Sequence, residues 1–540
     1  MSYTAHRDTF ARDSLPPREQ WPELIFDLPE LQYPERLNCA AALLDDRVAQ
    51  GQGGRPALWS MVAGRPQAVS YEELLAWANR IARVLGEDLG LVPGNRVLLR
   101  GPNNPWMAAC WFGILKAGGI VVATMPLLRA KELTQIATKA KVSLALCDAR
   151  LLEELELARP ACPDLQRIVC FGSEAPGSLD ILCQAKPADF AKVDTAAEDV
   201  ALIAFTSGTT GQPKGTMHFH RDVLAMCDCF PRSVLRPAPE DIFCGTPPLA
   251  FTFGLGGLLC FPLRFGASTA LVEKLLPETL LQTIRDFSAT ICFTAPTFWR
   301  LMAPLAKAGG VGRLAKCVSA GEALPDATRQ LWKDATGIEI IDGIGATEMI
   351  HIFISSPPEE VRRGAIGRVV PGYQARIVDD AGQPLPPGTV GKLAVKGPTG
   401  CRYLADERQK NYVQNGWNLT GDAFSMDADG YFFYQARTDD MIISAGYNIA
   451  GPEVEGTLLE HPAVAECGVV AVPDEERGQI VKAFVVLRPG FAPGEAMVKA
   501  LQDFVKQNIA PYKYPRAIEF LDSLPRTETG KLQRFKLRLG

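Results

Sequence analysis

A run of hydroxyls, glycines and one lysine at residues 206–215 has the composition needed to bind a polyphosphate. It reads Thr-Ser-Gly-Thr-Thr-Gly-Gln-Pro-Lys-Gly and directly follows the apolar run at residues 200–205. Glycines let the backbone bend until several N–H groups point at one anion, hydroxyls donate further hydrogen bonds, and Lys214 supplies a full positive charge. The pattern therefore predicts a phosphate-binding loop after a strand.

This run is not a Walker A loop, because that motif needs Ser or Thr after the lysine at the start of a helix. Here Pro213 precedes Lys214 and Gly215 follows it, so no helix is expected to begin at the lysine. Taken alone, the run is also compatible with a surface turn that has no function. Residues elsewhere in the chain must decide between the two.

Two later segments carry carboxylates in patterns that suit a nucleotide. Residues 343–348 set Thr347 beside Glu348 on a glycine-rich turn, which suits a phosphate oxygen and the Mg²⁺ that neutralises it. Residues 420–422 put Asp422 on a predicted tight turn, where it can accept hydrogen bonds from sugar hydroxyls. Taken alone, Asp-containing turns are common structural features.

Two more polar segments follow towards the C-terminus. Residues 437–440 read Arg-Thr-Asp-Asp, and residues 525–531 end with Lys531 directly after a glycine. Alone, the first would be a solvated linker and the second a surface charge. Their order along the chain, rather than any one of them, carries the functional information.

The composition is that of a globular protein whose charge is balanced overall. The 540 residues are 47% hydrophobic and 22% charged, with a formal net charge of −5. This length predicts a large core and more than one domain. The charge argues against a nucleic-acid-binding surface, so a phosphate site has to be local.

The fourteen cysteines are scattered through apolar segments, which favours reduced side chains and a cytoplasmic protein. Cys227 and Cys229 lack the spacing and the second pair that a zinc site needs. The N-terminal residues alternate charge and proline and predict no signal peptide. Residues 242–263 are uncharged but contain Pro247, Pro248 and Pro262 together with Gly254, Gly256 and Gly257, so a buried segment is expected rather than a membrane helix.

The elements that position these segments alternate between helices and short strands. Residues 71–89 have helical periodicity, and short apolar strands are predicted at residues 96–99, 120–123, 290–293, 317–319 and 339–341. This alternation is typical of an α/β fold with a largely parallel sheet flanked by helices.

Near residue 370 the pattern changes to hairpin strands at 375–378 and 391–395, which predicts a small β-subdomain over about residues 370–436. We place the main boundary at Asp439. Residues 1–438 then form a large N-terminal domain, and residues 439–540 form a compact α+β C-terminal domain.

The five polar segments occur in the order found in the adenylate-forming superfamily of acyl- and aryl-CoA synthetases, peptide-synthetase adenylation domains and luciferases. The chain resembles this superfamily from about residue 35 to Arg538. The resemblance implies the family's fold and the use of ATP, Mg²⁺ and coenzyme A. A carboxylate would be activated as its adenylate and then transferred to a thiol.

The resemblance also implies a role for each matching residue. The loop residues Thr206, Ser207, Gly208, Thr209, Thr210, Gly211 and Lys214 would hold the β- and γ-phosphates of ATP. Thr347 would contact the α-phosphate, and Glu348 the metal. Adenine and ribose would be bound by Gly321, Glu322, Asp342, Gly343, Ile344, Asp422 and Arg437. Many relatives carry an aromatic residue at Ile344, so adenine is expected to stack here on an aliphatic side chain.

Lys531 matches the lysine of the family's C-terminal motif, which bridges a substrate carboxylate oxygen and the α-phosphate. A cation between two anions stabilises the charge that develops at phosphorus in the transition state. The resemblance implies that the C-terminal domain rotates about Asp439, which withdraws Lys531 from the site. Gly446 and Tyr447 would then line a tunnel for coenzyme A.

The acid pocket is predicted at Thr252, Phe253, Gly345, His351 and Ile352, because residues 348–353 closely resemble benzoate- and aminobenzoate-CoA ligases. Core aromatics and a structural histidine are the alternative interpretation of these side chains. Relatives that take benzoate often carry Ala at the position of Thr252 and Tyr at that of Phe253. Relative to those enzymes, this chain gains a hydroxyl at Thr252 and lacks one at Phe253. These two differences favour a ring with an ortho or meta polar substituent, as in 2-aminobenzoate.

We therefore expect an AMP-forming aryl-acid:CoA ligase that acts on benzoate or a substituted benzoate. Its partners would be small molecules, without nucleic acid or membrane, and its assembly a monomer or homodimer. A stand-alone adenylation enzyme that loads a carrier protein is the main alternative, since it would share every nucleotide-binding residue. A light-emitting oxygenase of the same fold and a non-catalytic nucleotide-binding protein are further alternatives.

Overall fold

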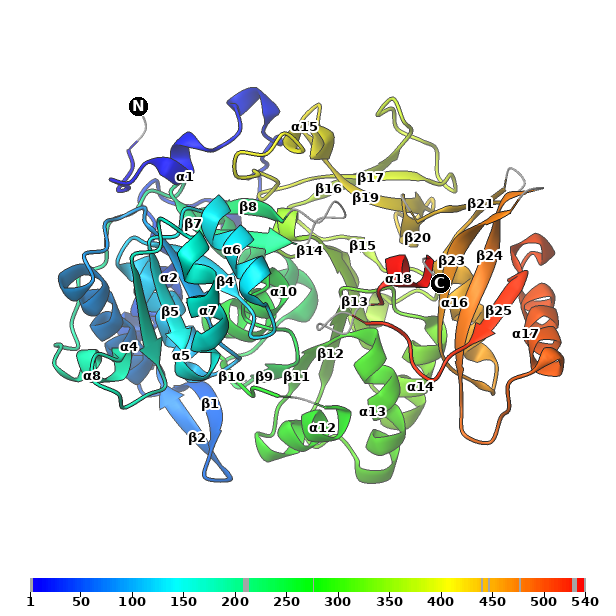
Figure 1. Ribbon diagram of the computed structural model, residues 1–540, viewed down its shortest axis with the longest axis horizontal. Helices are drawn as coiled ribbons and strands as arrows, with labels where there is room; N and C mark the ends of the chain where they lie inside the picture. The colour runs from blue at the N-terminus through cyan, green and yellow to red at the C-terminus, as the bar shows by residue number, and fades with distance from the viewer. Residues whose placement is uncertain are drawn as a thin grey trace.

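The computed structural model of the chain is shown in Figure 1, and it describes residues 3–206, 213–274, 276–438, 440–444, 447–474, 477–526 and 532–538. For Tyr447 and Asn448 only the backbone is described. Several predicted site residues lie outside the described residues: Ser207, Gly208, Thr209, Thr210, Gly211, Asp439, Gly446 and Lys531.

One six-stranded sheet carries the predicted phosphate loop between its last two strands. In order, its strands are β6 (Arg167–Phe171), β5 (Leu144–Asp148), β3 (Arg96–Arg100), β4 (Ile120–Thr124), β7 (Val200–Thr206) and β8 (Lys214–Phe219). The first five are parallel, and β8 runs antiparallel to β7. Thr206 pairs with Lys214 across the two strands, so the loop leaves and re-enters the sheet at one point.

A nine-stranded sheet contains the strand that leads into the second polar segment, residues 343–348. Its strands, in order, are β15 (Arg368–Val369), β14 (Ile352–Ser355), β13 (Ile340–Gly345), β12 (Lys316–Ala320), β11 (Ile291–Thr294), β9 (Ile242–Gly245), β10 (Ser268–Ala270), β1 (Pro56–Val62) and β2 (Arg65–Ser70). The six strands from β13 to β1 are parallel. The pairs β1–β2, β13–β14 and β14–β15 are antiparallel. The predicted strands are therefore confirmed.

Helices cover both sheets (Figure 1). The longer ones are α4 (Tyr71–Arg83), α5 (Pro105–Lys116), α6 (Ala130–Lys139), α9 (His220–Asp228), α12 (Pro277–Asp286), α13 (Pro296–Gly309) and α14 (Asp326–Thr336). Helix α4 begins with a capping box in which the Ser70 and Glu73 side chains accept each other's backbone N–H groups. Its buried residues Leu74, Ala78 and Ile81 recur at helical spacing, which explains the amphipathic pattern read from the sequence.

A smaller antiparallel sheet contains β16 (Gln374–Val378), β17 (Gly391–Lys396), β18 (Val413–Gln414), β19 (Trp417–Met426) and β20 (Phe432–Arg437). The predicted tight turn at residues 420–422 is wrong, because these residues lie inside β19. There β19 bulges: Leu419 and Ala423 pair with Ala394 and Lys392, so extra residues of β19 face a shorter stretch of β17. Gly421 takes φ +77° at the bulge, which explains a turn-like sequence inside a strand.

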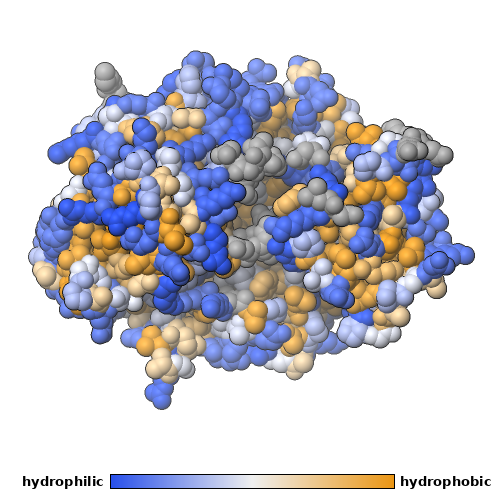
Figure 2. Space-filling view, viewed as in Figure 1, coloured by the Kyte–Doolittle hydropathy of each residue, from blue (hydrophilic) through white to orange (hydrophobic). Residues whose placement is uncertain are grey.

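The C-terminal residues form a separate unit with its own hydrophobic core, at the right of Figure 1. It contains the hairpin β21 (Ile442–Ser444) and β22 (Tyr447–Ile449), a sheet of β23 (Val464–Asp474), β24 (Gly478–Leu487) and β25 (Ala517–Phe520), and the helices α16 (Gly451–Glu460), α17 (Glu495–Asn508) and α18 (Arg534–Arg538). Figure 2 shows this face of the molecule hollowed at its centre, between the C-terminal unit and the larger part of the chain.

The apolar segment at residues 242–263 is buried as short elements. It contains β9, α10 (Thr252–Leu255), the π-helical turn Gly256–Cys260 and α11 (Phe261–Arg264). No helix among the described residues is long and apolar enough to cross a membrane. All fourteen cysteines are free thiols, as the sequence predicted.

Candidate active site

The ends of two neighbouring parallel strands bring the predicted nucleotide residues together. Gly321 and Glu322 follow β12, Asp342, Gly343 and Ile344 lie on β13, and Thr347 and Glu348 belong to a single 3₁₀ turn, Thr347–Met349, directly after it. Ligands of α/β sheets bind at the carboxyl ends of the strands. The 3₁₀ turn also contacts β7, so this edge meets the strand that leads into the phosphate loop.

Lys214 and Glu348 are joined through the hydroxyl of a third residue, Tyr403. Lys214 Nζ donates to Tyr403 Oη at 3.2 Å, and that hydroxyl donates to Glu348 Oε1 at 2.5 Å. The direct distance from Lys214 Nζ to Glu348 Oε1 is 3.9 Å. Tyr403 is 1% exposed and Glu348 8%. Burial and the neighbouring carboxylate raise the pKa of Tyr403 far above its usual value, so the phenol keeps its proton.

Three buried polar side chains, His218, Asp222 and Arg402, form a chain of contacts that begins at the Thr347 carbonyl. The Nε2–H of His218, on β8, donates to the Thr347 carbonyl oxygen at 2.8 Å. Asp222, on α9, accepts a hydrogen bond from Arg402, and both side chains are fully buried. Burial alone would raise the pKa of Asp222, but the charge of Arg402 and the contact with the His218 ring lower it below its usual value.

Segment 401–404 connects these groups to the phosphate loop. The Met217 N–H donates to the Arg402 carbonyl, the Leu404 N–H donates to the Gly215 carbonyl, and Tyr403 forms a β-bridge with Thr216. Arg402 and Tyr403 are thus held against β8, the strand that begins at Lys214. Segment 401–404 therefore contacts both β8, which follows the phosphate loop, and the Glu348 side chain.

The predicted adenine side contains a buried carboxyl group. Asp342 accepts the Gly343 N–H at 3.0 Å, and Arg329 Nη2 lies 3.9 Å from its second oxygen. Burial raises the pKa of Asp342 to about 7, against the lowering effect of Arg329. Ile344 is partly exposed next to it, as an aliphatic platform for adenine requires.

The predicted ribose side is a cross-strand pair. Asp422 on β19 faces Arg437 on β20, and Arg437 Nη1 donates to Asp422 Oδ1 at 3.1 Å. Burial raises the pKa of Asp422, and the Arg437 charge opposes that shift. A Cβ at Gly421 would lie 2.8 Å from Arg437 Nη2, so glycine at the bulge leaves room for the arginine.

The C-terminal segment reaches the predicted adenine side. The Leu532 N–H donates to Glu322 Oε1 at 3.1 Å, and Arg526 Nη1 lies 3.9 Å from the same oxygen. Figure 1 shows the chain returning from β25 past α14 towards β13. Arg526 and Leu532, the described residues on either side of residues 527–531, therefore both lie beside Glu322.

The predicted acid pocket is an aromatic enclosure around a neutral histidine. The His351 ring lies 4.5 Å from that of Phe261, 5.6 Å from that of Phe253 and 6.0 Å from that of Phe230, between centroids. Its Nε2–H donates to the Phe253 carbonyl at 3.3 Å. Burial lowers the pKa of His351 to about 3, so the ring is uncharged at neutral pH.

Close backbone contacts fix this histidine. A Cβ at Gly256 would lie 2.4 Å from His351 Cδ2, and a Cβ at Gly345 would lie 2.7 Å from the His351 carbonyl carbon. Ile350 takes φ +66°, a rare conformation for a β-branched residue, between Glu348 and His351. Thr252 is buried on α10, and Ile352 begins β14 opposite Gly345. The chain thus turns sharply between the nucleotide residues and the acid pocket.

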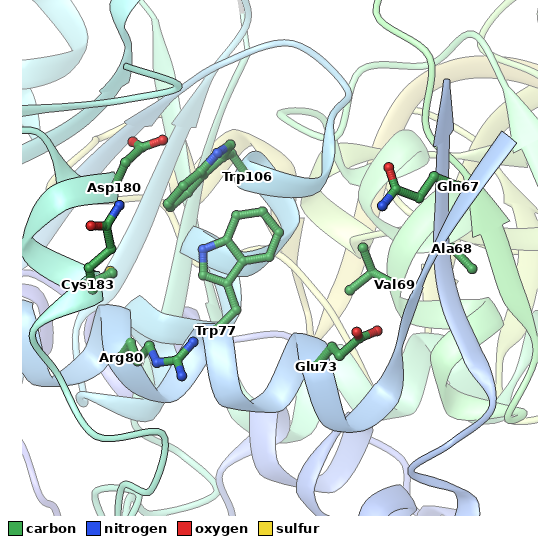
Figure 3. Close-up of a pocket in the computed structure, with 10 residues that line it drawn as sticks. Gln67, Ala68, Val69, Glu73, Trp77, Arg80, Trp106, Asp180 and Cys183 are labelled. Atoms are coloured by element: carbon green, nitrogen blue, oxygen red, sulfur yellow. The ribbon is translucent and has the colours of Figure 1, made fainter. Parts of the chain in front are cut away.

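A groove elsewhere on the surface is unrelated to these residues. It has a volume of about 440 Å³ and lies between β2, α4 and α8 (Leu179–Gln184), with Trp77 and Trp106 on its walls (Figure 3). None of the predicted site residues lines it. The candidate site is therefore the one at the strand ends.

Residues 45–403 match the AMP-binding enzyme family, and residues 453–531 match the C-terminal domain of AMP-binding enzymes. The chain belongs to the AMP-binding enzyme family. It is 35% identical to a benzoate–CoA ligase of Thauera aromatica, over 94% of this chain and 97% of that one. It is 32% identical to a 3-hydroxybenzoate–CoA ligase of Aromatoleum sp., over 93% and 96%.

Two solved structures of the AMP-binding family have the same fold. An anthranilate CoA ligase, AuaEII, in complex with anthranoyl-AMP superposes with a TM-score of 0.89 at 34% identity, over 94% of this chain and 98% of that one. A benzoate CoA ligase from Burkholderia xenovorans gives 0.85 at 32% identity, over 93% and 100%. The predicted adenylate-forming fold and the AMP-forming acid–CoA ligase class are confirmed.

Glu348 is the residue predicted to bind the metal. No group of three or more His, Cys, Asp or Glu side chains that could hold a metal occurs among the described residues. Glu348 offers one carboxylate, of which Oε1 is engaged by Tyr403. Magnesium is commonly bound in AMP-binding and other nucleotide enzymes by one or two carboxylates together with substrate phosphates. A Mg²⁺–ATP complex fits this donor set.

The sequence analysis missed Tyr403, Arg402, His218 and Asp222. Arg402 and Asp222 are 180 positions apart, and no local pattern marks either as a partner of the other. The one available signal was the sequence around His218, where a histidine and an acid four positions apart follow the phosphate loop of the AMP-binding family.

Proposed function

We propose that this enzyme is an ATP- and Mg²⁺-dependent aryl-acid:CoA ligase that acts on benzoate or a ring-substituted benzoate such as 2-aminobenzoate. The observation that carries the substrate proposal is the uncharged aromatic enclosure around His351, one turn away from Thr347 and Glu348. A flat ring fits among aromatic side chains, while its carboxylate is directed towards the nucleotide residues. The ligases that this chain resembles act on benzoate, 3-hydroxybenzoate and anthranilate.

The contacts of the described residues support the following nucleotide roles. The loop at residues 206–215 holds the β- and γ-phosphates, with Lys214 as its cation. Thr347 contacts the α-phosphate, Glu348 would hold the metal, and Asp422 accepts the ribose hydroxyls beside Arg437. When bound, Mg²⁺ neutralises phosphate charge and so supports attack at phosphorus.

The first half-reaction joins two anions. A substrate carboxylate oxygen attacks the α-phosphorus, the bond to the bridging oxygen breaks, and pyrophosphate leaves with the electron pair. Lys531 stabilises the extra negative charge in the transition state, and the Leu532–Glu322 contact supports its approach to the nucleotide. In the second half-reaction the thiolate of coenzyme A attacks the acyl carbon, and AMP leaves.

The remaining assignments rest on the same family pattern. Residues 1–438 and 439–540 act as separate domains, with Asp439 as the hinge and Gly446 and Tyr447 beside the path of coenzyme A. The fourteen free thiols, thirteen of them buried, support a reducing compartment such as the cytoplasm. The enzyme works as a monomer or homodimer in the degradation of aromatic acids.

The substrate proposal favours a polar ring substituent because the buried Thr252 hydroxyl needs a partner. Purified enzyme is assayed for pyrophosphate release with benzoate, 2-aminobenzoate and hydroxybenzoates at matched concentrations. Turnover of 2-aminobenzoate above benzoate supports the substituent, and far better turnover of benzoate overturns it. Release of aryl-CoA on addition of coenzyme A separates the ligase from an enzyme that loads a carrier protein.

A further inference from the structure

The hydroxyl of Tyr403 lies between a cation and an anion that have different tasks in the proposed reaction. It accepts a hydrogen bond from Lys214 at 3.2 Å and donates one to Glu348 at 2.5 Å. The ammonium group also lies 5.2 Å from the centre of the tyrosine ring, within the range of a cation–π interaction. Tyr403 is therefore the common contact of the phosphate lysine and the carboxylate of the metal site.

The geometry without this hydroxyl would be different. Lys214 Nζ is already 3.9 Å from Glu348 Oε1. A side-chain movement of about 1 Å would make a direct, charge-assisted hydrogen bond between them, at the 2.7–2.9 Å typical of such pairs. In that arrangement the lysine would neutralise the carboxylate and turn away from the phosphates. The phosphates would then lose a cation, and the metal would lose a carboxylate ligand.

The position of Tyr403 is held firmly enough for this task. Its segment pairs with β8 on one side, and the Tyr403 N–H donates to Gln409 Oε1 at 2.9 Å on the other. The ring packs edge-on against Tyr412, 5.9 Å away between centroids. The hydroxyl is thus fixed in place by contacts that do not involve Lys214 or Glu348.

We infer that Tyr403 is a positioning residue that keeps Lys214 and Glu348 apart, so that the lysine serves the phosphates and the carboxylate serves the metal. The inference rests on the proposed function, and it assigns to this chain's own tyrosine the separation of the two charges. Tyr403 contacts neither the acid nor coenzyme A in this proposal.

The chain offers a matched control for the test. Tyr403→Phe removes the hydroxyl and keeps the buried ring with its packing. Tyr412→Phe removes the hydroxyl of the neighbouring ring, whose buried Oη has no hydrogen-bond partner among the described residues. Both variants lose one oxygen from adjacent tyrosines, but only the first loses the contacts to Lys214 and Glu348.

The measurement is the binding of Mn²⁺, a paramagnetic substitute for Mg²⁺, to the full-length enzyme with ATP and without acid. The signal of free Mn²⁺ in electron paramagnetic resonance gives the dissociation constant, after subtraction of Mn²⁺ bound to ATP alone. Tyr403→Phe is expected to raise this constant about tenfold, as loss of a hydrogen bond to a charged group predicts. Tyr412→Phe should stay within about twofold of wild type.

Steady-state kinetics give the second readout. In Tyr403→Phe the apparent KM for Mg²⁺ should rise by a similar factor, and excess Mg²⁺ should restore most of kcat. Unchanged Mn²⁺ binding in Tyr403→Phe overturns the inference, and so does an equal loss in both variants, which would indicate general packing. If wild-type enzyme itself does not bind Mn²⁺ with ATP, the proposed function fails together with the inference.

Discussion

The predicted nucleotide side of the site contains charged side chains, whereas the predicted acid side contains uncharged aromatic ones. The chain passes from one side to the other within four residues. On the nucleotide side, buried aspartates lie beside arginines: Asp222 pairs with the buried Arg402, and Asp422 pairs with Arg437, whose side chain is half-exposed. On the acid side, His351 is held uncharged among phenylalanine rings. In the proposed function, the first arrangement would serve charged phosphates and the second an uncharged aromatic ring. The proposed reaction class and the proposed substrate choice therefore depend on different residues.

The largest expected effect is on the stability of the nucleotide side. Arg402→Met leaves Asp222 as an unpaired buried charge, which should lower the free energy of unfolding by about 3–5 kcal/mol. Urea unfolding of purified protein measures it. Arg363→Met is the control, because Arg363 also pairs with an aspartate, Asp326, but is 82% exposed, and its loss should cost about 1 kcal/mol or less. Equal losses in the two variants would remove the distinction between buried and exposed pairs.

Removal of Lys531 should affect one half-reaction only. Lys531→Ala is expected to slow pyrophosphate formation from acid and ATP by roughly 10²–10³, about 3–4 kcal/mol, by analogy with the loss of one oxyanion donor. Thioester formation from prepared aryl-AMP and coenzyme A should remain largely intact. Comparable losses in both half-reactions would contradict a role limited to adenylation.

The neutral histidine of the acid side predicts a dependence of stability on pH. Burial lowers the pKa of folded His351 to about 3, below the ordinary value of 6.5. Between these values the unfolded chain binds more protons, so the free energy of unfolding should fall as pH decreases from 6.5 towards 3. The slope contributed by one such histidine is at most about 1.4 kcal/mol per pH unit.

His351→Leu tests this contribution, because its unfolding free energy should depend less steeply on pH than that of wild type. His220, whose pKa is also lowered to about 3 by burial, keeps its own contribution and so serves as the internal reference. An unchanged slope in His351→Leu would show that His351 is not buried as a neutral ring.

The smallest expected effect concerns substrate preference. Thr252→Val replaces the hydroxyl by a methyl group of the same shape, and should shift the ratio of kcat/KM towards benzoate and away from 2-aminobenzoate by about 1 kcal/mol, roughly fivefold. Thr252→Ser keeps a hydroxyl and should preserve the wild-type ratio. If both variants shift the ratio equally, pocket shape rather than hydrogen bonding sets the preference.

The sequence predicted well those features that depend on neighbours along the chain. The apolar run before the phosphate loop became β7, and the Thr347–Glu348 pair lies at the end of β13, because short buried strands and glycine-rich ends have local signatures. The turn predicted around Asp422 was wrong, since the same glycine that makes a turn can make a bulge. Contacts such as Lys214 with Tyr403 join residues 189 positions apart, and only the fold brings them together.

In the proposed function, the contact between Glu322 and the backbone of Leu532 would link nucleotide binding to the position of the C-terminal unit. If the segment that ends at Leu532 strengthens ATP binding by some factor, thermodynamic reciprocity requires ATP to strengthen the docking of that segment by the same factor. Nucleotide occupancy then acts as a latch. In the proposed reaction, the strength of this link would depend on whether the site holds ATP, the acyl-adenylate or AMP.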